Sequence, residues 1–110
     1  MKQNSLQMTL LFDYYGELLT EKQRDFFDLY YEQDLSLAEI SEEAGISRQG
    51  IHDALSKAES ALLHFEEKLG CVAKEQKLQK QLDVIQAAAE ELNATPQAAR
   101  ILDAVRKLKE

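Results

Sequence analysis

Residues 35–70 read LSLAEISEEAGISRQGIHDALSKAESALLHFEEKLG. Ser36 and Glu39 have the spacing of a capping box, which predicts that a helix of about two turns begins here. Gly45 suits the left-handed backbone that ends a helix, and Ser47 is a favoured N-cap for the helix that follows. Two helices joined by a tight turn containing glycine predict a helix-turn-helix.

The second helix of this unit is predicted to be the longer one and to end at Gly70. Its apolar residues are spaced by four or three positions: Ile51, Leu55, Ala58, Leu62, Phe65 and Leu69. Such spacing gives a helix one buried face. The motif also needs an apolar residue in its first helix (Ile40), a small one at the crossing (Ser41) and an apolar one after the glycine (Ile46). All three are present.

The chain before residue 35 predicts two further helices. The first covers residues 6–15 and ends at Gly16, with one apolar face made of Met8, Leu11, Phe12 and Tyr15. Thr20 and Gln23 form a second capping box, which begins a helix from about Glu21 to Gln33. An aromatic stripe follows on that helix at Phe26, Phe27, Tyr30 and Tyr31. Acidic neighbours favour a core role for this stripe over base stacking.

The chain after Gly70 predicts two more helices. Leu78, Leu82, Ile85, Ala89 and Leu92 form a heptad-like seam on a helix from about Lys74 to Leu92. Thr95 as N-cap and Pro96 at the first helical position begin a last helix that runs to about Leu108. We therefore expect a helix-turn-helix domain over 1–70 and a helical pair over 71–110. The pair would pack on that domain or form a homodimer, with the homodimer favoured.

Composition supports an all-α protein. Apolar residues make up 45% of the 110 residues, and there are one proline and four glycines. The single cysteine, Cys71, excludes an internal disulfide and suits a reducing compartment. Neither a signal peptide nor a stretch of about 20 apolar residues is found, so no membrane span and a cytoplasmic location are expected.

The net charge of −7 is unevenly distributed. Residues 1–45 hold 3 basic and 10 acidic residues, whereas residues 46–110 hold 10 of each. A basic stripe typical of nucleic-acid binders is missing. The acidic half could instead steer the protein to a basic partner.

Nothing in the sequence predicts an enzyme. His52 and His64 lie twelve positions apart on one helix, roughly 18 Å, and cannot share a metal. Phosphate-binding glycine loops and catalytic serine motifs are missing. We therefore expect no catalytic residue, metal or other cofactor.

The start of the second motif helix holds the candidate nucleic-acid contacts. In DNA-binding members of the class, this segment meets base edges in the major groove. Arg48 could contact guanine, Gln49 adenine, and His52 and Lys57 bases or phosphates, while Ser47 is first a cap. The alternative is that these residues are ordinary exposed polar side chains. Residues 36–58 contain two basic and four acidic residues, which lowers the expected affinity for DNA.

Two resemblances follow from these motifs. The segment LSLAEISEEAGISRQGIHDALSKAESAL resembles region 4 of bacterial sigma factors, over roughly residues 18–69. Nearly the whole chain is similar to the YlxM-like family of small bacterial proteins. The matching motifs are LFDYYG, LTxKQ, YYxxDLSLxEI and SRQGIxDAL.

The resemblance implies a regulatory protein with a sigma-region-4-like, three- to four-helical bundle without a wing, followed by two C-terminal helices. Family genes lie beside those of the signal recognition particle GTPases, which implies a role in that pathway. Its partners would be DNA, the particle's RNA or the particle's proteins, with Ser47, Arg48, Gln49, His52 and Lys57 at the contact. The alternative is a protein-interaction module whose acidic N-terminal half docks on a basic protein, without nucleic-acid readout.

Overall fold

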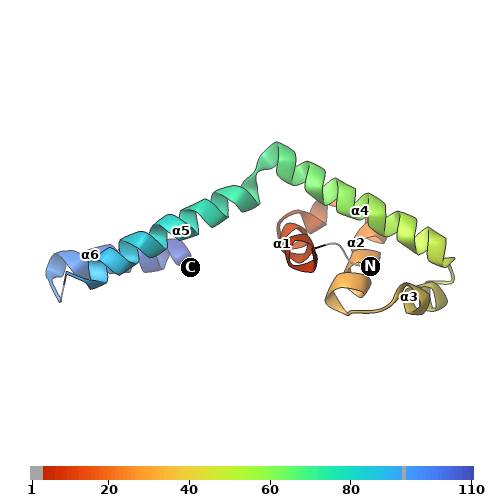
Figure 1. Cartoon of the computed structure of the whole chain (residues 1–110), viewed down its shortest axis with the longest axis horizontal. Coiled ribbons are helices and arrows are strands. Elements are labelled where there is room, and N and C mark those ends of the chain that lie inside the picture. Colours follow the sequence, from red (N-terminus) through yellow and green to blue (C-terminus); the bar gives the residue numbers. More distant parts are fainter. Residues whose placement is uncertain (1–3, 93) are drawn as a thin grey trace. The chain divides into compact units, whose positions relative to one another are not determined.

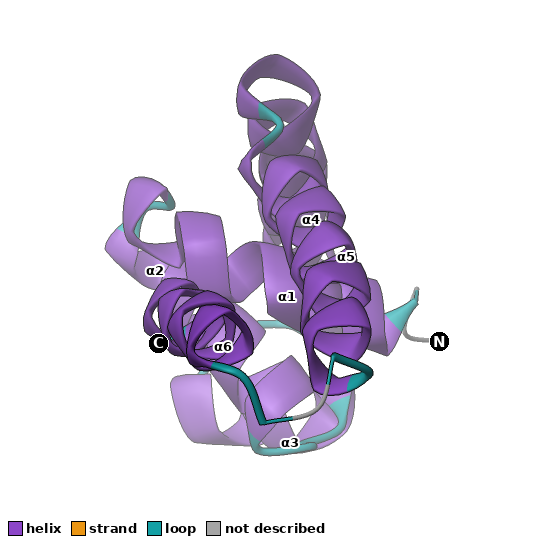
Figure 2. Ribbon diagram, turned by 90° about the vertical axis from the view of Figure 1, so that its left-hand side faces the viewer, coloured by secondary structure: helices purple, strands orange, loops and turns teal. Residues whose placement is uncertain are grey.

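The computed structural model describes residues 4–92 and 94–110. The chain divides into two compact units, Met1–Val72 and Ala73–Glu110, which are described separately below. Every regular element of the described residues is a helix or a helical turn, joined by short loops (Figure 2). The expected all-α class is confirmed. Within the described ranges, no helix is both long enough and apolar enough to span a bilayer.

Four α-helices and two short helical turns build the first unit (Figure 1). In chain order they are α1 (Ser5–Tyr15), the 3₁₀ turn η1 (Gly16–Leu18), α2 (Glu21–Phe27), the π-helical turn η2 (Asp28–Glu32), α3 (Leu37–Ala44) and α4 (Arg48–Leu69). The second unit consists of α6 (Pro96–Lys109) and most of α5 (Cys71–Glu90).

The helix starts lie where the capping residues predict them. Thr20 Oγ1 accepts from the Gln23 amide at 3.2 Å, and the Gln23 side chain accepts from the Thr20 amide at 3.1 Å. The same reciprocal pair joins Ser36 and Glu39, with both distances at 3.1 Å. Each box satisfies two amides that the helix itself leaves without partners. Both predicted boxes are confirmed.

The helix expected from Glu21 to Gln33 is present, but it changes type in its second half. The α-helix ends at Phe27, and a π-helical turn follows in which the Gln33 amide donates to the Asp28 carbonyl at 3.0 Å. Apolar spacing cannot reveal this change, because a single widened turn leaves the buried face almost unaltered. Asp34 then takes a left-handed backbone, with φ 57°, before α3 begins.

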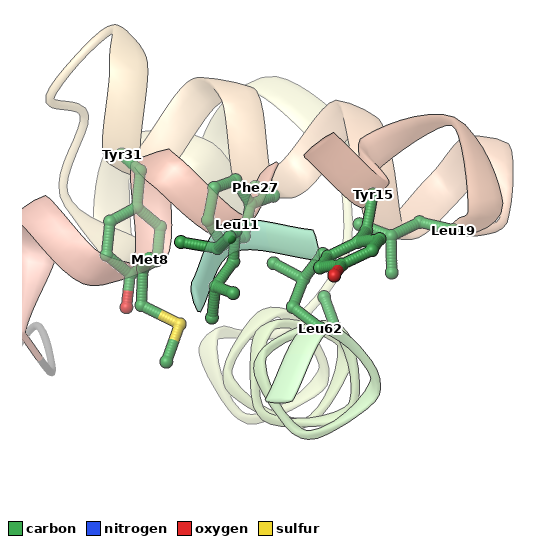
Figure 3. Close-up of a cluster of buried hydrophobic side chains, with 9 residues drawn as sticks. Met8, Leu11, Tyr15, Leu19, Phe27, Tyr31 and Leu62 are labelled. Carbon is green, nitrogen blue, oxygen red and sulfur yellow. The ribbon is translucent and has the colours of Figure 1, made fainter. Parts of the chain in front are cut away.

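The larger core cluster joins α1, α2 and η2 to the middle of α4 (Figure 3). Phe27 is fully buried and stacks on Phe12, with ring centroids 4.5 Å apart, and on Tyr31, 4.3 Å apart. The Tyr31 hydroxyl donates to a carboxylate oxygen of Glu59 on α4. The predicted core role of the aromatic stripe therefore holds for Phe27 and Tyr31, and Phe26 is buried in the neighbouring cluster.

A smaller core cluster fixes the helix-turn-helix itself. Phe26 of α2, Ile40 of α3, and Ile51 and Leu55 of α4 are buried together, and Ile46 packs against them from the turn. Ile40 and Ile51 have no exposed surface. Burying side chains of this kind contributes about 1.5–3 kcal/mol each. The cluster therefore sets the angle at which α3 meets α4.

A polar junction forms where α4 ends, at Gly70, with φ 63°. Tyr15 Oη donates to Glu66 Oε1 at 2.6 Å and accepts from the Cys71 amide at 3.1 Å. The same Glu66 oxygen accepts from the Val72 amide at 3.1 Å. Burial and the bond to Glu66 raise the pKa of Tyr15 to about 12. Because these amides are already fixed by the junction, α5 begins at Cys71, three residues before the predicted start at Lys74.

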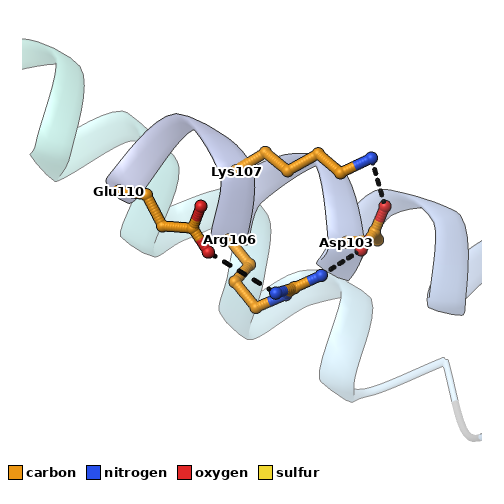
Figure 4. Close-up of polar contacts among 4 residues, drawn as sticks. All are labelled: Asp103, Arg106, Lys107 and Glu110. Atoms are coloured by element: carbon orange, nitrogen blue, oxygen red, sulfur yellow. Dashed lines mark hydrogen bonds and ion pairs between the residues drawn. The ribbon is translucent and has the colours of Figure 1, made fainter.

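The second unit has few buried side chains. They are Leu82 and Ala89 on α5 and Ala98 and Val105 on α6. Lys109 Nζ donates to Gln86 Oε1 at 2.8 Å and pairs with Asp83, which joins the two helices. On α6, Asp103 pairs with Arg106 and Lys107, and the hydrogen bonds from these two side chains lower the pKa of its carboxyl group (Figure 4). Thr95 caps α6, with Pro96 in its first turn, as predicted.

Candidate nucleic-acid interface

The turn between α3 and α4 is built by local chemistry. Gly45 takes the left-handed backbone, with φ 71°, and its amide donates to the Ser41 carbonyl at 2.9 Å. The Ser41 hydroxyl donates to the Ile46 carbonyl, so the small residue at the helix crossing also ties down the turn. Ser47 Oγ then accepts from the Gly50 amide at 3.0 Å and begins α4. The predicted turn residues have the predicted roles.

Gly50 allows the turn to approach α4 closely. A Cβ atom at this position would lie 2.7 Å from Cγ2 of Ile46 and 3.3 Å from Oγ of Ser47. Contacts below 3.0 Å between carbon atoms force one of the two groups to move. Ile46 is held in the core cluster of Ile40 and Ile51, so its freedom to move is small. A glycine at position 50 is therefore a packing requirement of the turn.

All five predicted contact residues are exposed on the first three turns of α4. They are Ser47, Arg48, Gln49, His52 and Lys57. Ile51 and Leu55 of the same helix are buried. Arg48 and His52 are four residues apart and share one side of the helix, whereas Gln49 and Lys57 share the neighbouring side. Gln49, His52 and Lys57 thus lie on the solvent-facing surface of α4, and Arg48 lies at its edge, half a turn of rotation from Lys57.

Asp53 lies in the middle of this surface. Its Oδ1 accepts from Gln49 Nε2 at 2.9 Å and lies 3.9 Å from Nδ1 of His52. All three side chains are exposed, so these contacts are screened by solvent and exchangeable. The carboxylate orients Gln49 along the helix and offsets positive charge that Arg48 and Lys57 bring to the surface.

The structure adds a neighbouring feature that sequence reasoning missed. Thr20, Lys22 and Gln23 at the start of α2 line a shallow groove together with Gly50, Asp53, Ala54 and Lys57 of α4. Lys22 lies with its Nζ 5.9 Å from the centroid of the Phe26 ring and brings a second cation to the groove beside Lys57. Only the packing of α2 on α4 joins positions about 30 residues apart, so no local sequence signal could reveal it.

Acidic side chains border the surface on α3. Glu39, Glu42 and Glu43 are exposed there, and Glu39 also serves the capping box. In the part of the chain that the structure describes, no three His, Cys, Asp or Glu side chains are gathered as they would be around a metal ion. Cys71 carries a free, exposed thiol. The exposed side chains of α4 can form hydrogen bonds and ion pairs.

Fold and surface together define a helix-turn-helix protein. The chain matches, over residues 2–102, the family UPF0122, described as "Putative helix-turn-helix protein, YlxM / p13 like", and it belongs to that family. A UPF0122 protein of Thermoanaerobacter sp. (strain X514) is 47% identical over 108 residues, covering 96% of this chain and 92% of the relative. A UPF0122 protein of Bacillus cereus (strain AH187) is 38% identical over 109 residues, covering 98% and 99%. The resemblance to the YlxM-like family is confirmed.

Proposed function

We propose that this protein is a non-enzymatic regulator that binds duplex nucleic acid through the exposed start of α4 and acts in the signal recognition particle pathway. The observation that carries the proposal is the exposure of the first turns of α4. Ile51 and Leu55 anchor the helix in the core, while Arg48, Gln49 and His52 point to solvent from its first turns. This is the arrangement by which a recognition helix reaches base edges in the major groove.

The groove width favours DNA over double-stranded RNA as the ligand. The major groove of B-form DNA, about 12 Å wide, admits an α-helix, whereas that of A-form RNA is too narrow for side chains to read. Arg48 is suited to guanine and Gln49 to adenine, and Lys57 with Lys22 would contact phosphates. Single-stranded loops of the particle's RNA remain the second ligand to compare.

Charge sets the expected strength of binding. Two cations, Lys22 and Lys57, line the groove, and Arg48 adds a third, whereas strong DNA binders contact about 6–10 phosphates. Asp53 and the acidic residues of α3 repel phosphate in addition. We therefore expect modest affinity with a shallow dependence on salt concentration.

The exposed acidic residues of α3 support the alternative function, a module that docks on a basic protein. Glu42 and Glu43 are both exposed beside the turn. Complementary charge speeds encounter between such surfaces. In this alternative Glu42→Gln and Glu43→Gln weaken binding, and Arg48→Ala leaves it unchanged.

The test is a fluorescence-anisotropy titration of labelled mixed-sequence duplex DNA and of the particle's RNA with the full chain at low salt. The proposal predicts saturable binding to DNA that Arg48→Ala weakens. The matched control is Lys68→Ala, which removes an exposed cation from the last turn of the same helix. Equal losses for the two variants, or flat traces with both nucleic acids, would contradict nucleic-acid binding through this surface.

A further inference from the structure

The C-terminal unit leaves large apolar side chains in solvent. Exposed fractions are 43% for Leu78, 46% for Ile85, 53% for Leu92, 37% for Ile101 and 60% for Leu108. By comparison, the buried side chains of this unit are Leu82, Val105 and two alanines. Two helices with so small a core are marginal by themselves. The exposed side chains therefore need a partner surface.

These exposed residues lie on one face of the pair. On α5, Ile85 follows the buried Leu82 by three residues and precedes the buried Ala89 by four. On α6, Ile101 stands in the same relation to the buried Ala98 and Val105. α6 runs back along α5, antiparallel to it (Figure 1). In two antiparallel helices, residues that stand in the same relation to the buried residues between the helices lie on the same side of the pair.

The opposite side of the helix pair is polar. The bond from Lys109 to Gln86 and the ion pair from Lys109 to Asp83 lie there, since Asp83 and Gln86 follow Leu82 by one and four residues. The helix pair is thus amphipathic as a whole. We call the side formed by Leu78, Ile85, Leu92, Ile101 and Leu108 the apolar face.

We propose that the apolar face binds a second copy of this chain, and that the two helix pairs form a four-helix bundle. The stripe is symmetric in sequence, because Leu78 on α5 and Leu92, two residues past the end of α5 at Glu90, each lie seven residues from Ile85. An antiparallel second α5 therefore sets Ile85 against Ile85 and Leu78 against Leu92. Such self-complementarity is what a two-fold interface requires.

Charge along α5 selects the antiparallel direction. The first half carries Lys74, Lys77 and Lys80 against one acidic residue, Glu75, whereas Glu90 ends the helix and Glu91 follows it. Lys77 directly precedes Leu78, and Glu91 directly precedes Leu92. Antiparallel pairing brings Lys77 of one copy beside Glu91 of the second copy, twice in each dimer. Parallel pairing of the two α5 helices would instead align like charges.

The face is large enough for a dimer. At 1.5 Å per residue α5 is about 30 Å long and α6 about 21 Å, and each is about 10 Å wide. The projected area is roughly 500 Å² per copy, so the dimer would bury roughly 1,000 Å² in total, near the lower bound of specific interfaces. The dimer contains two helix-turn-helix units. The proposed dimer does not depend on whether α4 binds nucleic acid.

The test is sedimentation equilibrium of the full chain across micromolar concentrations. Wild type is expected to be a dimer, and Ile85→Glu to raise the dimer dissociation constant by about a hundredfold or more, because it buries an unpaired charge. Leu63→Glu is the matched control, since Leu63 is 40% exposed on α4, and it should remain dimeric. Circular dichroism checks that both variants keep their helices. A monomeric wild type, or a dimeric Ile85→Glu, would overturn the proposal.

A charge exchange tests the direction of pairing. Lys77→Glu and Glu91→Lys are each expected to weaken the dimer several-fold, and the double variant to restore it. This rescue requires the two positions to meet across the interface. Single losses without rescue would overturn the antiparallel arrangement.

Discussion

Gln49 donates a hydrogen bond to Asp53, 2.9 Å from Nε2 to Oδ1, one turn further along α4. The side chain best suited to reading adenine is therefore held along its own helix by a carboxylate. Asp53 also lies 3.9 Å from Nδ1 of His52. One acidic residue thus acts on two candidate contacts, and it lowers the positive potential of the whole surface.

Asp53→Asn should strengthen binding to duplex DNA. The substitution removes one negative charge among approaching phosphates, worth about 1 kcal/mol at contact distance in water, or roughly a fivefold gain in affinity. Anisotropy titration at low salt measures the gain. The control is Asp13→Asn, which removes an exposed carboxylate from α1 and should leave the titration unchanged. Weaker binding by Asp53→Asn would show that the carboxylate itself makes a contact.

Gly50→Ala should destabilise the first unit, although alanine is the better helix former. The added Cβ would lie 2.7 Å from Cγ2 of Ile46, and overpacking of this kind costs about 1–3 kcal/mol. Urea denaturation measures the loss. In an Ile46→Ala background the contact is gone, so Gly50→Ala should then be neutral or stabilising. The same cost in both backgrounds would refute this explanation for the glycine.

The Tyr15 junction predicts a loss of stability at high pH. Its pKa is raised from 10.0 to about 12, so the fold favours the neutral phenol. That contribution is complete below pH 10 and is lost as the pH rises towards 12. Thermal melts of Tyr15→Phe should show a lower Tm at neutral pH and a smaller further fall between pH 10 and 12. Tyr14→Phe, on an exposed neighbour, should keep the alkaline fall of wild type.

Ser36→Ala should weaken the start of α3. The hydroxyl accepts from the Glu39 amide at 3.1 Å, and loss of an N-cap of this kind costs about 1 kcal/mol. Ser60→Ala, at an exposed position inside α4, is the control and should cost little. Chemical denaturation of both variants compares them directly. Equal stabilities would mean that packing of Ile40 alone holds α3 in place.

The sequence predicts those parts of the fold that depend on neighbours within four residues. The boxes at Thr20 and Ser36, the left-handed Gly45 and the cap at Ser47 follow from such local bonds. The π-helical turn after Phe27 could not be predicted, since a widened turn leaves the apolar spacing almost unchanged. Leu69, expected on the buried face of α4, is 52% exposed because α4 extends beyond the core residues that pack against it.

The candidate surface was predictable only in part. The exposure of Gln49 follows from its place opposite Ile51 and Leu55 on α4, whereas Arg48 shares the side of Leu55 and is exposed at the first position of the helix. The proximity of Lys22 to Lys57 depends on the packing of α2 against α4, which residue spacing does not encode.

The salt dependence of DNA binding tests the central claim most directly. Each phosphate contact contributes about 0.9 to the slope of log K against log salt concentration for duplex DNA. We predict a shallow but measurable slope for wild type, reduced by about 0.9 in Lys57→Ala, which removes a phosphate contact, and unchanged in Lys68→Ala. A wild-type slope of zero, or one that Lys57→Ala leaves unaltered, would contradict nucleic-acid binding by the start of α4.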